Sequence, residues 1–265
     1  MKKYHVYFVV LLLETWHSYS DFGWLGIRYI ISELKKEPGI TVSAKFIEYK
    51  NWKYQLQNLV KEEPDMVGLP ALQPNLPFIQ EFTSHLRKQS AKVKIVIGNS
   101  EATMRPDTLL ENISAVDFAV IGEGEHTFRE LAVKCMRGEP VDQCRGLCYR
   151  KAGKIYYTAP RLLEENLDAF AFPDRGVLPM HVHNKVYDII TSRGCYGNCS
   201  FCSNETFKMQ PGKRVRVRSL KNVIDEIELL VKRYNCGYVS ISDDTFGDPL
   251  VTNGFSYLDF HNALL

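Results

Sequence analysis

HVYFVVLLL, residues 5–13, is the stretch of sequence that decides the fold. Strands that are buried on both faces of a parallel sheet have such continuous apolar runs, whereas half-exposed strands alternate. The preceding Met1-Lys2-Lys3 makes the run look like a secretory signal, but Glu14, Trp16 and His17 follow where a signal has small residues for cleavage. The run is also far too short to span a bilayer. We therefore expect a buried parallel strand and a cytoplasmic protein.

Further segments of this kind follow, and helix-like patterns separate them. The other strand candidates are Val42–Tyr49, Met66–Pro70, Val93–Gly98 and Phe118–Gly122. The helix candidates are Trp24–Lys36, Tyr54–Lys61, Pro77–Lys88, Pro106–Asn112 and Glu125–Met136. Alternation of strands and helices predicts an α/β fold, with an open, doubly wound, Rossmann-like parallel sheet of five strands over residues 1–138.

The pattern changes after Gly138. Residues 139–185 contain a hairpin at Leu147–Tyr157 and an ordered linker through Phe172-Pro173-Asp174-Arg175. A second α/β unit covers residues 186–265. Its elements are a strand at Tyr187–Thr191, a helix at Val223–Tyr234 with Ser219 as N-cap, and a strand at Tyr238–Ser242. We expect Arg216 and Arg218 at the surface or at a barrel rim, and no convincing helix over Leu250–Leu265.

The composition is that of an ordinary globular protein. The 265 residues are 45% hydrophobic and 24% charged, and the net charge is +2. This small charge gives no electrostatic reason to expect nucleic acid or an acidic membrane as a partner. The seven cysteines are odd in number and partly gathered in one loop, which favours a reducing compartment and a metal site over a disulfide framework.

The loop TSRGCYGNCSFC, residues 191–202, has the spacing C-x3-C-x2-C. Three thiolates on one loop can hold three corners of a four-iron cluster and leave one iron open to a chelating substrate. Zinc is the alternative, but it needs a fourth ligand, which Cys236 or a histidine would have to supply. Cys144 and Cys148 repeat the first half of the spacing without a third partner, so we expect them to pack in the hairpin.

Another candidate ligand site lies where the parallel strands end. Ligands of open α/β sheets bind beyond the carboxyl ends of the strands. The loop Ile121–Thr127 (IGEGEHT) puts two glycines there, and the following helix offers free N–H groups to a polar or anionic ligand. The alternative is that these glycines only satisfy the geometry of a strand-to-helix turn.

The cysteine loop resembles that of the radical S-adenosylmethionine (radical SAM) superfamily. The resemblance implies that Cys195, Cys199 and Cys202 bind a [4Fe-4S] cluster and that Phe201 lies near the adenine of SAM. There the reduced cluster cleaves SAM to methionine and a 5′-deoxyadenosyl radical. Asp243 and Asp244 follow the strand at which the family contacts the SAM amino group, although a strand-end turn with solvated acids explains them equally well.

The order of the parts resembles the cobalamin-binding radical SAM proteins over residues 4–248. The implied cobalamin contacts are Gly98, Asn99, Gly122, Glu123, Gly124, Glu125 and Thr127. Asn99 stands where the family has glycine, and Pro70 where it has serine. The motif Asp-x-His-x-x-Gly, which supplies a histidine to cobalt, is absent from residues 14–23. We therefore expect no histidine on cobalt, and His17 is not a predicted ligand.

The resemblance implies a reductive cleavage of SAM for a radical methylation, ring formation or rearrangement. It implies three cofactors, namely the [4Fe-4S] cluster, SAM and cobalamin, and as partners a small-molecule substrate and an electron donor of the flavodoxin or ferredoxin type. Cys202 is followed by 265 − 202 = 63 residues, and one βα unit takes about 30. That predicts an incomplete barrel: a fragment, a truncated gene product, or a chain whose barrel a partner chain completes.

Two other functions stay open. The chain could be a non-catalytic corrinoid- or iron–sulfur-binding module. It could also be an RNA-modifying enzyme of the radical SAM methylthiotransferase type, which shares the Thr-Ser-Arg-Gly-Cys sequence. Such enzymes bring further cluster cysteines in their first domain, and here no cysteine precedes Cys135.

Overall fold

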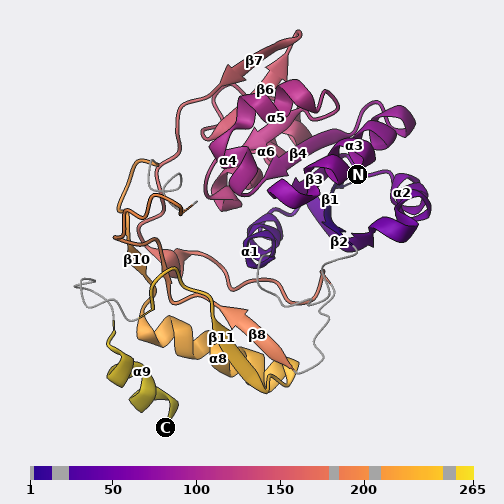
Figure 1. Cartoon of the computed structure of the whole chain (residues 1–265). Helices are drawn as coiled ribbons and strands as arrows, with labels where there is room; N and C mark the ends of the chain where they lie inside the picture. Colours follow the sequence, from indigo (N-terminus) through magenta and orange to yellow (C-terminus); the bar gives the residue numbers. More distant parts are fainter. Residues whose placement is uncertain (1–2, 14–23, 179–184, 203–209, 247–254) are drawn as a thin grey trace. The chain divides into compact units, whose positions relative to one another are not determined.

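The computed structural model describes residues 3–13, 24–178, 185–202, 210–246 and 255–265 (Figure 1). These residues form two compact units. The first comprises the described parts of Met1–His17, Gly26–Arg161 and Pro173–Pro179, and the second those of Ser18–Leu25, Leu162–Phe172 and Met180–Leu265. Among the described residues, no helix is both long and apolar enough to cross a membrane.

The first unit is built on a seven-stranded sheet with the order β2-β1-β3-β4-β5-β6-β7. The first five strands are parallel, and β6 and β7 are antiparallel. The strands are β1 (Tyr4–Leu12), β2 (Ile40–Glu48), β3 (Met66–Pro70), β4 (Lys94–Gly98), β5 (Phe118–Val120), β6 (Leu147–Lys151) and β7 (Lys154–Tyr157). The prediction of a doubly wound α/β sheet is confirmed, but the sheet has two strands more than the five expected, because the hairpin joins it.

Helices cover both faces of this sheet. They are α1 (Leu25–Leu34), α2 (Trp52–Lys61), α3 (Leu76–Gln89), α4 (Ser100–Met104), α5 (Pro106–Asn112) and α6 (Gly124–Arg137), with 3-10 turns at Tyr49–Asn51 and Gln73–Asn75. The sequence did not predict α4, which is only five residues long. It predicted the other five to within a few residues at each end.

Strand β1 is the centre of the core, as its apolar run predicted. From Val6 to Leu12 every residue is buried. Tyr7, Val9 and Leu11 belong to one hydrophobic cluster with residues of α2, α3 and α5. On the opposite face, the rings of Phe8 and Phe128 in α6 lie 5.0 Å apart. Gly68 in β3 makes room for this pair, since a Cβ there would lie 2.8 Å from the Phe8 ring.

The second unit contains one parallel βαβ arrangement. Strands β8 (Val186–Ile189) and β11 (Tyr238–Ile241) pair in parallel, and α8 (Leu220–Tyr234) connects them. The short strands β9 (Ser192–Arg193) and β10 (Arg216–Val217) form an antiparallel pair. A 3-10 turn lies at Leu167–Ala169. Ser219 caps α8, because its hydroxyl accepts a hydrogen bond from the Asn222 amide at 3.2 Å.

Two expectations for this unit were wrong. Arg216 and Arg218 are 3% and 2% exposed, so neither lies at the surface. Arg218 pairs at 2.5 Å with Glu226 of α8, which is equally buried. The end of the chain also contains a helix, α9 (Tyr257–Leu264). A reciprocal pair of hydrogen bonds between Ser256 and Asp259 starts this helix, a capping-box signal that the sequence reading missed.

Candidate cobalamin and iron–sulfur sites

The first candidate site lies at the carboxyl ends of the parallel strands of the first unit. The strand order 2-1-3-4-5 changes direction between β1 and β3, and ligands of such sheets bind at this switch point. The residues after β1, including His17, lie outside the described residues. The turn after β3 is described. It is organised by the fully buried Asn75, whose side chain accepts a hydrogen bond from the Leu72 amide at 3.0 Å and donates one to the Pro70 carbonyl at 3.3 Å.

None of the predicted cobalamin contacts lies in the turn after β3. They lie at the ends of β4 and β5, one and two strands away. The signal that identifies the β3 turn is the strand order, which depends on long-range pairing and is not visible in local patterns.

Gly98, the last residue of β4, and Asn99, which follows it, have the properties of an open binding edge. A Cβ on Gly98 would meet no atom within 4 Å. Asn99 has φ +76° and ψ −166°, a conformation that is nearly exclusive to glycine and costs about 1–3 kcal/mol for other residues. Its side-chain oxygen accepts a hydrogen bond from the Ser100 amide at 2.6 Å. Asn99 thus keeps the backbone of the glycine that it replaces.

The loop after β5 shows why its glycines are needed. Gly122 has φ +75°, and its amide donates to the Thr103 hydroxyl at 2.9 Å. A Cβ on Gly124 would lie 2.9 Å from the side chain of Ile30 in α1. Glu123 precedes the first residue of α6, and Glu125 is 3% exposed. The geometry of this turn therefore requires both glycines. The cobalamin contacts of the loop stay a prediction.

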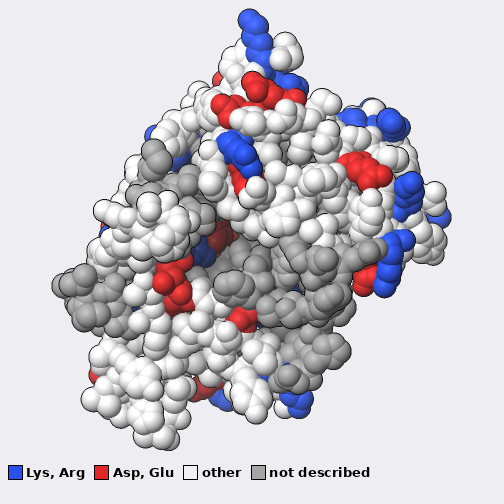
Figure 2. All heavy atoms as spheres, viewed as in Figure 1, with Lys and Arg blue, Asp and Glu red and all other residues white. Residues whose placement is uncertain are grey.

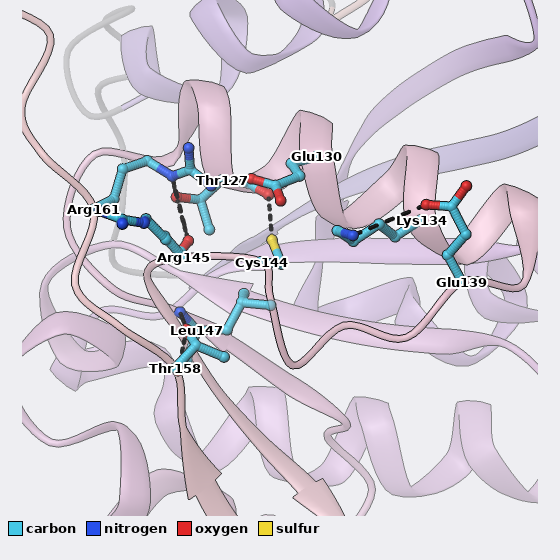
Figure 3. A network of polar contacts seen from close by, with 9 residues as sticks. All are labelled: Thr127, Glu130, Lys134, Glu139, Cys144, Arg145, Leu147, Thr158 and Arg161. Atoms are coloured by element: carbon cyan, nitrogen blue, oxygen red, sulfur yellow. Dashed lines mark hydrogen bonds and ion pairs between the residues drawn. The ribbon is translucent and has the colours of Figure 1, made fainter.

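Thr127 supports the hairpin through a polar network (Figure 3). Its hydroxyl is fully buried, accepts a hydrogen bond from Arg161 Nε at 2.7 Å and donates to the Arg145 carbonyl at 3.2 Å. Arg161 also forms an ion pair with Glu130 of α6. A contact of Thr127 with cobalamin stays a prediction, but its hydroxyl already has two partners within the protein.

Cys144 and Cys148 pack in the interior, as predicted. Both are fully buried. Burial raises the pKa of the Cys144 thiol to about 12 and that of the Cys148 thiol to about 11. The Cys144 sulfur lies 3.6 Å from the Thr127 carbonyl, to which it can donate (Figure 3). Thiols with such pKa values stay protonated at neutral pH, and metal binding needs the thiolate.

The second candidate site is the cysteine loop between β9 and the residues before β10. Gly194 has φ +90°, and a Cβ there would lie 2.0 Å from the Arg214 carbonyl oxygen. The chain can make this turn only with glycine. The Arg214 guanidinium donates to the Gly197 carbonyl at 3.0 Å and to the Asn198 side chain at 2.6 Å. The segment before β10 therefore holds the cysteine loop from one side.

The sulfurs of Cys195 and Cys199 both lie close to Gly197. A Cβ on Gly197 would be 3.4 Å from the Cys195 sulfur and 3.6 Å from the Cys199 sulfur. The Gly197 amide donates to the Cys195 sulfur at 3.2 Å, and the Cys202 amide donates to the Cys199 carbonyl at 3.0 Å. None of the three cysteines is in a disulfide. This donor set and the space at Gly197 fit an iron–sulfur cluster.

The sulfurs of Cys195, Cys199 and Cys202 are not arranged around one common metal position. Over the described ranges, which omit residues 203–209, no three His, Cys, Asp or Glu side chains are arranged to hold a metal ion. The predicted adenine neighbour, Phe201, is 91% exposed. Cys199 is also exposed, whereas Cys195 and Cys202 are half-buried, so the loop presents one cysteine and its aromatic ring outward.

Cys236 cannot be the fourth ligand of a zinc ion in this loop. Strands β8 and β11 are parallel, with Tyr238 opposite Val186 and Ile241 opposite Ile189. Cys236 precedes β11, whereas Cys195 follows β8, so the two lie at opposite ends of the strand pair. Four residues of strand cover about 13 Å, and zinc–sulfur bonds are about 2.3 Å long.

The predicted SAM contacts Asp243 and Asp244 lie against the cysteine loop. Asp243 accepts hydrogen bonds from the Thr191 amide at 2.7 Å, from the Thr191 hydroxyl, and from the Ser192 hydroxyl at 2.9 Å. Burial raises the pKa of Asp243 in spite of these bonds. Asp244 is exposed and accepts a hydrogen bond from the Gly194 amide at 3.1 Å. Both acids thus hold the loop, and their contact with SAM stays a prediction.

Comparisons with known proteins identify the first of these two parts and find relatives of most of the chain. The protein family described as "B12 binding domain" matches residues 15–132. An "uncharacterized methyltransferase" of Pyrococcus horikoshii is 30% identical over 226 residues, which are 84% of this chain and 49% of that protein. The radical S-adenosylmethionine methyltransferase TsrM of Kitasatospora setae has a similar structure, with a TM-score of 0.74 and 19% identity, over 99% of this chain and 50% of that one.

The chain belongs to the B12-binding-domain radical SAM proteins. Another relative is the anaerobic magnesium-protoporphyrin IX monomethyl ester cyclase of Rubrivivax gelatinosus, which is 28% identical over 69% of this chain and 34% of that protein. A structure of the family member OxsB, with aqua-cobalamin bound, has a TM-score of 0.69 and 20% identity over 93% of this chain and 34% of that one. The chain spans about half the length of these relatives or less.

Proposed function

We propose that this chain carries the cobalamin-binding unit and the cluster loop of a radical SAM enzyme. Cobalamin binds at the carboxyl ends of the parallel strands of the first unit, and a [4Fe-4S] cluster binds to Cys195, Cys199 and Cys202. The observation that carries the proposal is the cysteine loop: a Cβ on Gly197 would lie within 3.6 Å of two of its sulfurs. The reducing environment that these thiols need favours a cytoplasmic location.

A bound cluster would supply the electron that converts SAM into methionine and a 5′-deoxyadenosyl radical. The residues of this chain bind and orient the reactants. Phe201 offers an exposed ring for the adenine, and Asp244 is an exposed carboxylate beside the loop for the SAM amino group. The names of the relatives, methyltransferases and ring-forming cyclases, favour a radical methylation or rearrangement of a small molecule. An electron donor of the flavodoxin or ferredoxin type would reduce the cluster.

The cluster is tested by anaerobic reconstitution with iron and sulfide. We expect a brown protein with about four irons per chain, since three thiolates hold a four-iron cluster. Cys195→Ala, Cys199→Ala and Cys202→Ala should each lose most of this iron. Cys236→Ala is the matched control, because Cys236 lies at the other end of the β8–β11 pair, and it should load like the wild type.

A colourless protein that takes up one zinc ion instead of iron contradicts the proposal. Formation of 5′-deoxyadenosine from SAM after addition of dithionite tests the reaction itself. The same measurement repeated with each cysteine variant shows whether the product depends on the cluster loop.

The two-stranded β8–β11 sheet favours a second candidate function. Tyr238 and Val186, on these strands, are 69% and 37% exposed, and strand pairs alone are marginal in stability. A barrel needs further strands, from a longer chain or from a partner chain. Without them, the protein would act as a corrinoid- and cluster-binding module. Cobalamin binding without any 5′-deoxyadenosine supports this second candidate.

A further inference from the structure

Three consecutive residues that follow Ser242 at the end of β11 each contact a different part of the cysteine loop. Asp243 binds Thr191 and Ser192, and Asp244 binds the amide of Gly194. Thr245 reaches one position further, because its hydroxyl donates a hydrogen bond to the Cys195 sulfur at 3.3 Å. The carbonyl of Thr245 in turn lies 3.4 Å from the Ser192 hydroxyl, which shares its one proton between this carbonyl and Asp243 at 2.9 Å. Contacts on both sides therefore fix the position of Thr245.

Cys195 differs from the other two cysteines in its hydrogen bonds. Its sulfur accepts one from Thr245 and one from the Gly197 amide at 3.2 Å. Within the part of the chain that the structure describes, no such bond to the sulfur of Cys199 or Cys202 is recorded. The loop is thus asymmetric, with its two donors directed at the first cysteine.

Hydrogen bonds to cysteine sulfurs are one of the properties that set the potential of an iron–sulfur cluster. Reduction adds negative charge to the cluster and its ligands. A donor at a ligand sulfur stabilises that charge, so it favours the reduced form and raises the reduction potential. The Thr245 hydroxyl is a removable donor of this kind, whereas the Gly197 amide is part of the backbone.

We propose that Thr245 is a positioning residue that raises the reduction potential of the cluster through its hydrogen bond to Cys195. The proposal rests on the iron–sulfur site proposed above. It concerns a residue about fifty positions away from the cysteine motif, which the β8–β11 pair brings to the motif.

The test is a redox titration of the reconstituted protein, followed by the electron paramagnetic resonance signal of the reduced cluster. Thr245→Val removes the donor and keeps the shape of the side chain. We expect the ratio of oxidised to reduced cluster at a fixed potential to rise about tenfold, which is about 59 mV for a one-electron couple. Thr245→Ser keeps the hydroxyl and should restore the wild-type potential.

Ser242→Ala is the matched control, because the Ser242 hydroxyl binds Asp188 at 3.3 Å rather than the cysteine loop. It should titrate like the wild type. Equal potentials for the wild type and Thr245→Val, at equal iron content, overturn the inference. If Thr245→Val and Thr245→Ala both fail to hold four irons while Thr245→Ser does, the hydroxyl is needed for assembly and the inference is also wrong. Failure of the wild type to take up iron refutes the proposed function instead.

Discussion

Gly194 makes the sharpest turn of the cysteine loop, and Gly194→Ala should disrupt it. The added methyl would overlap the Arg214 carbonyl oxygen, and φ +90° is costly for alanine. The backbone strain alone is worth about 1–3 kcal/mol. We expect a lower melting temperature and a loss of most of the iron after reconstitution. Gly176→Ala is the control, since the nearest atom to a Cβ there is 4.0 Å away. Wild-type iron content in Gly194→Ala would contradict this account of the loop.

Gly197→Ala should separate cluster binding from folding. Its methyl would make only ordinary contacts, at 3.4 and 3.6 Å, with the sulfurs of Cys195 and Cys199. The melting temperature of the iron-free protein should therefore stay within about a degree of the wild type, because no atom has to move. Iron uptake should fall severalfold, because the methyl fills the space between two ligands. Undiminished uptake by Gly197→Ala would mean that the cluster does not use this space.

Residue spacing predicted the cysteines of the site, but it could not predict what contacts them. Cys195, Cys199 and Cys202 lie in one short motif, so their common role is visible locally. The bond from Thr245 to Cys195 spans fifty residues and exists only because β8 and β11 are parallel neighbours. Arg216 and Arg218 were misplaced for a related reason. The local sequence around a buried arginine does not differ from that around an exposed one. The ion pair of Arg218 with Glu226 forms only when α8 packs, so the sequence alone does not predict it.

The start of α8 depends on the ion pair between Arg218 and Glu226. Arg218 also donates to the Ile190 carbonyl and to the Asn222 side chain, both at 2.7 Å, so it joins the end of β8 to the helix. Arg218→Met removes the guanidinium that pairs at 2.5 Å with the buried Glu226 carboxylate, and breaking a buried ion pair in this way costs about 3–5 kcal/mol. The double variant Arg218→Met with Glu226→Leu should recover much of that loss. Denaturant unfolding and hydrogen exchange of residues 220–234 measure the free energy of unfolding of both variants. A loss below about 1 kcal/mol in Arg218→Met contradicts the prediction.

The linker segment around Asp174 is held to the end of α1 in a pH-dependent way. Burial alone would raise the pKa of Asp174, but hydrogen bonds from Lys35, Val177 and Gly176 outweigh burial and lower it. A lowered pKa in the folded state means that this carboxylate stabilises the protein above about pH 4, and that the gain is lost as the pH falls through the folded pKa. Asp174→Asn should therefore melt a few degrees below the wild type at pH 7. The difference should shrink toward pH 3. If the difference in melting temperature between the wild type and Asp174→Asn grows as the pH falls, the prediction is wrong.

The positions of the strands along the chain were easier to predict than the way in which the strands pair into a sheet. The five parallel strands and the hairpin were each visible from apolar runs and a Gly153 turn. Whether the hairpin lies apart or joins the sheet depends on the pairing of Phe118 with Tyr149, about thirty residues away. The pattern of apolar residues within a strand does not tell which other strand it pairs with. The switch point lies between β1 and β3 for the same reason: its position depends on which strands pair.

At the scale of the whole molecule, the two units should load their cofactors independently. Cys195→Ala should lose iron and keep its affinity for cobalamin within about twofold, about 0.4 kcal/mol. Gly98→Leu should lose affinity for cobalamin and keep its iron, because a Cβ at Gly98 meets no atom within 4 Å and the longer side chain extends into the space at the carboxyl end of β4. Equilibrium dialysis with cobalamin and iron analysis on both variants test this. Loss of both cofactors in either variant would show that the sites are coupled.

Charged side chains of both signs are interspersed on the face drawn in Figure 2. Strand β7 lies at the edge of the large sheet. The turn from β6 to β7 has positive φ at Ala152 and Gly153, and exposed Lys151 and Lys154 flank it (Figure 1). A short outer strand with lysines repels the approach of a like strand. The protein should consequently tolerate concentration without edge-to-edge polymerisation, and replacing both lysines by threonine should promote fibrils that bind thioflavin T.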